Sequence, residues 1–325
     1  MADRGAMGGI EAAVELLPPD LGPHAPGNTG IPYVWSFEGP APGPHVLLNA
    51  LMHGNELCGA IALDRLLRAE LRPRRGRLSL TFANVEAFAA FDPAHPVLSR
   101  YRDEDMNRVW APGQLDGPRR SAELDRARAL RPLFETADLL LDIHSMQHAT
   151  PPLTLCGRSA RGRALALRLG HPSWVVADQG HAAGLRLIDH PRFAGPGAAT
   201  AILVECGQHW ERASAEVALA TALRFLLLAG SIDAGDAEAL LPGGPPPPPM
   251  PPRLVEVTEA VTVRHDCFAF AADYRGMEII PRAGTPIARD GDEPVLTPYD
   301  DCLLIMPSRR LARGHTAVRL GRIVA

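Results

Sequence analysis

Residues 45–56 read His-Val-Leu-Leu-Asn-Ala-Leu-Met-His-Gly-Asn-Glu, an apolar run that ends in a group of polar side chains. Runs of this kind are typical of strands that are buried on both faces of a parallel sheet. Residues 138–144 and 199–206 have the same design, because each apolar stretch closes on ionisable side chains. The three segments therefore predict strands whose polar ends meet at one edge of a sheet, where ligands of such sheets bind.

The rest of the first 240 residues alternates between strand-like and helix-like patterns. This alternation predicts an α/β fold with a mainly parallel mixed sheet that is flanked by helices on both faces. Before residue 45 we expect an irregular, Pro- and Gly-rich lead-in with one strand near 32–37. Further strands are expected at 78–85 and 173–178, and helices at 56–71, 121–135, 159–169 and 213–230.

A proline-rich segment interrupts this pattern at residues 241–252, where positions 245–249 are five consecutive prolines. Such a run excludes a helix or a central strand and favours a stiff polyproline II spacer. We therefore expect a catalytic domain over residues 1–240, a linker over 241–252 and a smaller all-β domain over 253–325. Short strands are expected there at 254–257, 261–263, 278–280, 294–296 and 302–306.

The composition is that of a globular protein, with 46% hydrophobic residues, 22% charged residues and a net charge of −4. This charge indicates no general attraction to nucleic acid or to an anionic membrane, so we expect a small-molecule partner. All 33 basic residues are arginine, which excludes chemistry that needs a lysine. Five scattered cysteines and the absence of a signal-like N-terminus predict a cytoplasmic protein, and homo-oligomerisation is left open.

The polar ends of the three strands carry a candidate metal site. His53 and Glu56 follow the first strand, and His144 ends the second. Two histidines and a glutamate are a common ligand set for catalytic zinc, which keeps one position for water. Glu205, at the end of the third strand, is expected to be a general base. Taken singly each residue also fits a structural role, such as a buried histidine or a solvent-facing glutamate, but together they predict one Zn²⁺ per chain.

Two carboxylates and a charged segment extend the candidate site. Asp142 lies two residues before His144 and is expected to orient a ligand from behind. Residues 100–108 read Arg-Tyr-Arg-Asp-Glu-Asp-Met-Asn-Arg, which fits either a solvated loop or a substrate-binding loop. In the second interpretation Arg100 and Arg108 bind an anionic or polarised substrate, because guanidinium groups bind carboxylates through two hydrogen bonds. Asn107 adds a donor and an acceptor, and Asp105 positions an arginine.

Other residues near the predicted strand ends are given structural roles. Any of the histidines there could line the pocket, but positions at the surface or as caps are favoured. Cys58 and Cys206 adjoin the site motifs and are expected to pack as small buried residues. Ser145 follows His144, but no Gly-x-Ser-x-Gly motif surrounds it, so a serine hydrolase is not expected. The histidines in question are His148, His181, His190 and His209.

These motifs resemble the succinylglutamate desuccinylase and aspartoacylase family, which is related to zinc carboxypeptidases. The resemblance is carried by HGNE at 53–56, RYRDEDMNR at 100–108, DIHS at 142–145 and VECG at 204–207, and by residues 284–300 of the tail. It implies a zinc carboxypeptidase-like fold, zinc bound by the three ligands above and Glu205 as general base and acid.

The resemblance also implies roles for the substrate-binding residues. Arg100 would polarise the scissile carbonyl, Asn107 and Arg108 would bind a substrate carboxylate, and Tyr299 would line the pocket. One departure concerns specificity: aspartoacylase has a further substrate-binding arginine shortly before the catalytic glutamate. Here that stretch, residues 194–199, has none, and Arg192 is the nearest candidate. The substrate preference of aspartoacylase is therefore not transferred to this chain.

The expected function is that of a zinc-dependent amidohydrolase that removes an N-acyl group from a small, carboxylate-bearing amino-acid derivative. A metallocarboxypeptidase that acts on peptides would share the same metal ligands and remains an alternative. A non-catalytic protein with a structural zinc is a second alternative, and it predicts a closed four-ligand site. A third is that the C-terminal β region mainly binds a partner.

Overall fold

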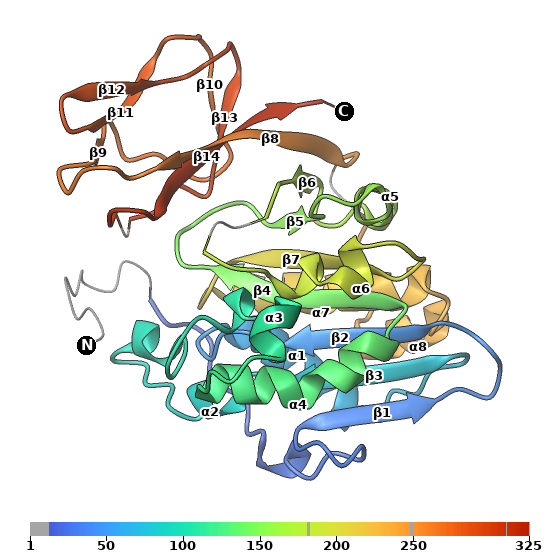
Figure 1. Cartoon of the computed structure of the whole chain (residues 1–325). Helices are drawn as coiled ribbons and strands as arrows, with labels where there is room; N and C mark the ends of the chain where they lie inside the picture. Colours follow the sequence, from blue (N-terminus) through green and yellow to red (C-terminus); the bar gives the residue numbers. More distant parts are fainter. Residues whose placement is uncertain (1–12, 181–182, 248–249, 310, 325) are drawn as a thin grey trace.

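The computed structural model describes residues 13–180, 183–247, 250–309 and 311–324. In this part of the chain, one 11-stranded mixed sheet runs in the order β1-β3-β2-β4-β7-β5-β6-β8-β14-β13-β10 (Figure 1). Its strands are β1 (Val34–Glu38), β2 (His45–Ala50), β3 (Arg77–Phe82), β4 (Leu139–Met146), β5 (Leu153–Leu155), β6 (Trp174–Ala177), β7 (Thr200–Gln208), β8 (Arg253–Thr262), β10 (Glu278–Ile280), β13 (Cys302–Ile305) and β14 (Thr316–Ile323).

Helices cover both faces of this sheet, as the apolar strands require. Val46, Leu48 and Ala50 of β2 face a cluster formed with α1, α5, α7 and α8, whereas Leu47 faces the cluster that includes α3, α4 and α6. Among the described residues, no helix is both long and apolar enough to cross a bilayer. The helices are α1 (Leu57–Arg68), α2 (Val85–Phe88), α3 (Pro112–Leu115), α4 (Ala122–Thr136), α5 (Ala160–Leu169), α6 (Pro191–Ala194), α7 (Arg212–Leu228) and α8 (Ala234–Leu240).

The predicted α/β architecture is confirmed. Strands β2, β3, β4, β6 and β7 and helices α1, α4, α5 and α7 lie where the sequence predicts them, within a few residues at their ends. The core strands β3, β2, β4 and β7 are parallel. Sequence reasoning missed β5, which has only three residues and pairs antiparallel with β7. It also missed α8 and, in the C-terminal region, β9, β11 and β14.

The C-terminal strands continue the central sheet. β8 pairs in parallel with β6 and antiparallel with β14, so backbone pairing continues from the strands before the proline-rich segment into those after it. The two short strands expected at 254–257 and 261–263 are in fact the single strand β8, which a register shift bends rather than divides. A second sheet has the order β12-β11-β9, with β9 (Ala269–Phe270), β11 (Pro286–Asp290) and β12 (Glu293–Leu296).

The proline-rich segment lies between α8 and β8, and its described residues belong to no helix or strand. Pro248 and Pro249 lie outside the described residues. The polyproline II spacer and the domain boundary at 241–252 therefore stay predictions.

Gly54 holds the turn between β2 and α1 against a neighbouring loop. A Cβ atom at this position would lie 2.4 Å from the carbonyl carbon of Ala87 and 2.5 Å from the carbonyl oxygen of Ser99. The Gly54 amide also donates to the carbonyl oxygen of Arg100 at 3.0 Å. The glycine is required here because backbone atoms approach too closely for any side chain.

We expect Gly54→Ala to lower the free energy of unfolding by about 1–3 kcal/mol, because backbone atoms must move to admit the methyl group. Urea denaturation would measure this loss. Gly113→Ala is a matched control, since a Cβ there meets nothing within 4 Å. Equal stability of the two variants would contradict the close-approach argument.

Candidate metal centre and active site

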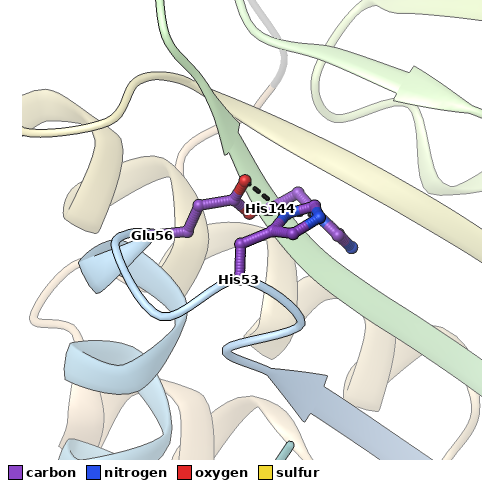
Figure 2. Close-up of side chains that lie close together, drawn as sticks. All are labelled: His53, Glu56 and His144. Atoms are coloured by element: carbon purple, nitrogen blue, oxygen red, sulfur yellow. Dashed lines mark hydrogen bonds and ion pairs between the residues drawn. The ribbon is translucent and has the colours of Figure 1, made fainter. Parts of the chain in front are cut away.

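Three buried side chains converge at the carboxyl edge of the sheet (Figure 2). His53 lies in the turn after β2, Glu56 is the N-cap residue of α1, and His144 lies in β4. One ligand atom from each lies within 4.8 Å of the others. The side chains of His53, Glu56 and His144 are 4%, 2% and 2% exposed. The predicted convergence of these residues is therefore present.

Both histidines present the same ring nitrogen to Glu56. His53 Nδ1 lies 2.7 Å from Glu56 Oε1, and His144 Nδ1 lies 2.9 Å from Glu56 Oε2. The opposite nitrogens contact carboxylates: His53 Nε2 lies 2.9 Å from Asp105, and His144 Nε2 lies 2.9 Å from Asp142 Oδ2. The contact between His144 and Asp142 is close enough for an ion pair, but its geometry is not that of a hydrogen bond. This is the arrangement that orients metal-binding histidines in proteins.

The charges of this cluster depend on one another. Burial alone would raise the pKa of Glu56, but His53 and His144 outweigh it and hold that pKa well below its usual range. Burial would lower the pKa of His144, but Asp142 and Glu56 raise it well above its usual range. His53, Glu56 and His144 would hold a divalent cation with both histidines neutral, since histidine binds metals in its neutral form.

The residues present fit a catalytic zinc ion. Two imidazole nitrogens and a carboxylate are a known catalytic donor set, and three protein ligands leave a position for substrate or water. Asp105 and Asp142 supply the outer contacts that such histidines need. The closed site of a structural zinc would need a fourth ligand, and the cluster found among the described residues contains three.

Glu205 lies beside this cluster on β7, directly opposite His144 in the parallel register of β4 and β7. Its Oε2 atom is buried and has no hydrogen-bond partner among the described residues. Burial raises the pKa of Glu205 to about 8; Glu56 adds to this, while His144 and Arg100 oppose it. A carboxylate so placed is suited to exchange protons with a bound ligand.

The loop that contains residues 100–108 reaches back to the metal ligands through Asp105. One Asp105 oxygen contacts His53 Nε2 and accepts from the Asn107 amide, and the other accepts from Arg100 Nη2 at 3.2 Å. Arg100 also lies 3.4 Å from Glu56. Burial alone would lower the pKa of Arg100, but Asp105 and Glu56 more than offset this, so the guanidinium stays charged.

Asn107 and Arg108 follow in a short 3-10 turn, Met106–Arg108. The Asn107 side-chain oxygen accepts from the Leu187 amide at 3.0 Å, which fixes the side chain at the cavity wall. Arg108 donates to the Asn107 carbonyl at 2.7 Å and stays 3.9 Å from Asp105. Arg100, Asp105, Asn107 and Arg108 therefore belong to the cavity wall, whereas residues 101–103 of the same loop are exposed.

A cavity of about 470 Å³ lies over this constellation. It is lined by all three metal-site residues, Glu205, Arg100, Asp105, Asn107 and Arg108. Residues 305–308 and 314–316 and Arg319, from the C-terminal strands and the loop between them, form part of its wall. The C-terminal region therefore contributes to the cavity wall.

Two sequence-predicted candidates lie elsewhere. Tyr299 is not among the cavity-lining residues: its hydroxyl contacts Thr258 Oγ1 at 2.6 Å, and Arg322 lies 4.2 Å over its ring. Tyr299 is therefore corrected to a packing residue of the C-terminal region. Arg192 donates to the Ala137 carbonyl, away from the cavity, so it does not replace the missing arginine.

The extra histidines have mixed outcomes. His190 caps α6, as expected, whereas His148 and His209 line the cavity. His209 is buried, its Nδ1 lies 2.9 Å from Ser145 Oγ, and burial lowers its pKa to about 3. His181 lies outside the described residues. No sequence signal separated His209 from the other histidines.

Sequence reasoning also missed three charged residues of the cavity wall, Asp178, Arg186 and Arg319. Arg186 donates two hydrogen bonds to Asp178 and a third to Asp189. The three side chains therefore pair with one another beside the site. Arg319 comes from β14, an element that the sequence analysis did not predict. None of these residues sits in a motif, so only the fold could connect them with the site.

Comparison with known proteins assigns the chain to a family. Residues 42–223, more than half of the chain, match the model of the succinylglutamate desuccinylase/aspartoacylase catalytic domain. The chain belongs to this family. Its family membership supports an enzyme with a deacylase activity, and it confirms the resemblance that the motifs indicated.

Solved structures with the same fold include several family members. Succinylglutamate desuccinylase from Chromobacterium violaceum has a TM-score of 0.65 and 20% identity, with 91% of this chain and 89% of that chain covered. A succinylglutamate desuccinylase/aspartoacylase from Rhodobacter sphaeroides has a TM-score of 0.62 and 21% identity, and the match covers 90% of this chain and 89% of that chain. The ectoine utilization protein EutE (DoeB) from Ruegeria pomeroyi, in a product-bound structure, has a TM-score of 0.60 and 20% identity. The match covers 89% of this chain and 87% of that chain.

For this family member we expect Asp105→Asn to weaken Zn²⁺ binding about 10- to 100-fold, because the amide no longer orients and polarises His53. Competition with a chromogenic chelator would measure the affinity. Glu216→Gln, a change of an exposed carboxylate on α7, is the matched control and should leave it unchanged. Equal affinities in both variants would rule out a role for Asp105 in metal binding.

Proposed function

We propose that this protein is a zinc-dependent amidohydrolase that removes an N-acyl group from a small, carboxylate-bearing amino-acid derivative. The observation that carries the proposal is the convergence of His53, Glu56 and His144 beside the unpartnered carboxylate of Glu205. The family's catalytic-domain match supports the deacylase class. We also propose that residues 1–240 are the catalytic domain and residues 253–325 a β-rich domain beyond the linker.

His53, Glu56 and His144 would hold the ion, which when bound supplies Lewis acidity and lowers the pKa of water. Glu205 takes a proton from the attacking water and returns it to the departing amine nitrogen. A carboxyl group with a pKa near neutrality suits both halves of this transfer. The burial of Glu205 supports this role, because bulk water does not compete for its free oxygen.

Arg100 is proposed to stabilise the negative charge that develops on the carbonyl oxygen. Its guanidinium is held beside the metal ligands by Asp105 and Glu56, so little reorganisation is needed during the reaction. Asn107 and Arg108 are proposed to bind the carboxylate of the amino-acid part. Arg108 has donors to spare, since Asn107 takes one at 2.7 Å and Asp105 stays at 3.9 Å.

A metallocarboxypeptidase remains the second candidate, because it would use the same metal ligands. The cavity volume of about 470 Å³ and its C-terminal wall favour a small substrate over a peptide. Release of free amine from N-acetyl, N-succinyl and N-formyl amino acids, compared with release of C-terminal residues from peptides, separates the two activities.

We expect Glu205→Gln to reduce kcat on N-acyl amino acids by a factor of about 10² or more, as for the loss of a general base. The measurement is amine release by the zinc-loaded protein. Zinc content should stay at one per chain, and Glu216→Gln should behave like the unchanged protein. If Glu205→Gln keeps the activity of the unchanged protein, Glu205 is not the general base. That result would favour the alternative of a non-catalytic zinc protein.

A further inference from the structure

Glu123 is a fully buried carboxylate that is not among the residues lining the cavity. It belongs to the first turn of α4, and its exposed fraction is 0%. A buried charge costs free energy unless hydrogen bonds compensate for the water that it has lost. The partners of Glu123 therefore show which part of the molecule this carboxylate stabilises.

The two oxygens of Glu123 accept four hydrogen bonds, three of them from consecutive backbone amides. Oε1 accepts from the Arg102 amide at 2.6 Å and from the Asn84 side chain at 3.0 Å. Oε2 accepts from the Asp103 amide at 3.0 Å and from the Glu104 amide at 3.2 Å. Hydrogen bonds to an ionised acceptor are roughly twice as strong as those between neutral groups. Glu123 therefore holds the backbone of this stretch of the charged loop.

Contacts with the start of α4 take the place of core packing in this part of the loop, because the side chains of residues 101–103 are exposed. The Asp103 carboxylate accepts from the Ala122 amide at 2.7 Å, and the Glu104 carboxylate accepts from the Ser121 hydroxyl. The first amides of a helix need acceptors from outside the helix. The loop and the helix therefore fix each other.

The residues on either side of this stretch carry side chains of the active site. Arg100 precedes it, and the Arg100 carbonyl oxygen accepts from the Gly54 amide at 3.0 Å. Asp105 follows it and contacts His53 Nε2 at 2.9 Å and Arg100 Nη2 at 3.2 Å. Glu123 holds the backbone between these two anchor points. The path of the loop, and with it the positions of the guanidinium and the carboxylate, therefore depends on Glu123.

We propose that Glu123 is a positioning residue of the active site, which sets the places of Arg100 and Asp105 through the amides of residues 102–104. Its own hydrogen bonds go to these amides and to Asn84, so it acts through the loop and not on the reacting atoms. This inference rests on the proposed function, in which Arg100 stabilises the charge that develops on the carbonyl oxygen. Such stabilisation requires a donor that is already in place before the reaction.

The first test is Glu123→Gln in the zinc-loaded protein. The amide has nearly the shape of the carboxylate, but it presents an NH₂ group to backbone amides that are themselves donors. We expect kcat on N-acyl amino acids to fall about 10- to 100-fold, because a small displacement of a catalytic group has an effect of this size.

Asp125→Asn is the matched control for this variant. Asp125 lies in the same turn of α4, but it pairs with Arg120 and Arg128 and not with the loop. Asp125→Asn should keep the kcat of the unchanged protein, and equal kcat values for the two variants would overturn the proposal. Glu123→Asp, which keeps the charge on a shorter side chain, serves if Glu123→Gln does not fold.

A double-mutant cycle separates positioning from a general loss of folded protein. Glu123→Gln is combined with Arg100→Ala, and kcat is measured again. Because Glu123 acts through Arg100, we expect Glu123→Gln to lower kcat by no more than about twofold once the guanidinium is gone, since coupled residues are not additive. A purely structural role predicts the same loss of kcat in both backgrounds. A loss that persists in the Arg100→Ala protein would therefore overturn the proposal.

Hydrogen exchange and zinc affinity test the inference without turnover. In Glu123→Gln the amides of residues 102–104 should exchange about 10-fold faster or more, because each has lost a hydrogen bond to a charged acceptor. Competition with a chromogenic chelator should show weaker Zn²⁺ binding, because Asp105 contacts His53.

The outcomes of these measurements are distinct. Unchanged exchange of the three amides would overturn the role of Glu123, and unchanged zinc affinity would overturn its effect on Asp105. Absence of hydrolysis with every N-acyl substrate, together with faster exchange and weaker zinc binding in Glu123→Gln, would overturn the proposed function instead.

Discussion

The parallel pairing of β2, β4 and β7 is the constraint on which the active site depends. Parallel strands end at the same edge, so three segments that are far apart in sequence bring His53, His144 and Glu205 together. The register places His144 directly opposite Glu205. A shift of one residue would turn either side chain to the other face of the sheet, so the apolar pattern that sets the register also sets the chemistry.

Buried charge is tolerated at this edge because nearly every charged group has a counterpart. Asp105 alone contacts His53, Arg100 and the Asn107 amide, and therefore ties the charged loop to the metal ligands. Within the part of the chain that the structure describes, one oxygen of Glu205 is an exception, because it is buried without a hydrogen-bond partner. A buried group of this kind is costly unless a ligand meets it, which is why Glu205 belongs to the proposed reaction.

The C-terminal strands complete the site by extending the central sheet. β8 bonds to β6 on one side and to β14 on the other, so the wall that carries Arg319 is held by continuous backbone hydrogen bonds. His144, Glu205 and Arg319 thus reach one cavity from separate strands of one sheet.

The sequence alone determined the α/β class, the strands β2, β4 and β7, and the cluster of His53, Glu56 and His144, because these depend on apolar periodicity and short motifs. It misplaced Tyr299 and did not find β5 or β14, which are too short or too irregular in pattern to be distinguished from loops. Only the tertiary structure decided that Arg319 enters the cavity and that Arg192 does not. The physical reason is that a side chain's surroundings depend on long-range strand pairing, which no local pattern encodes.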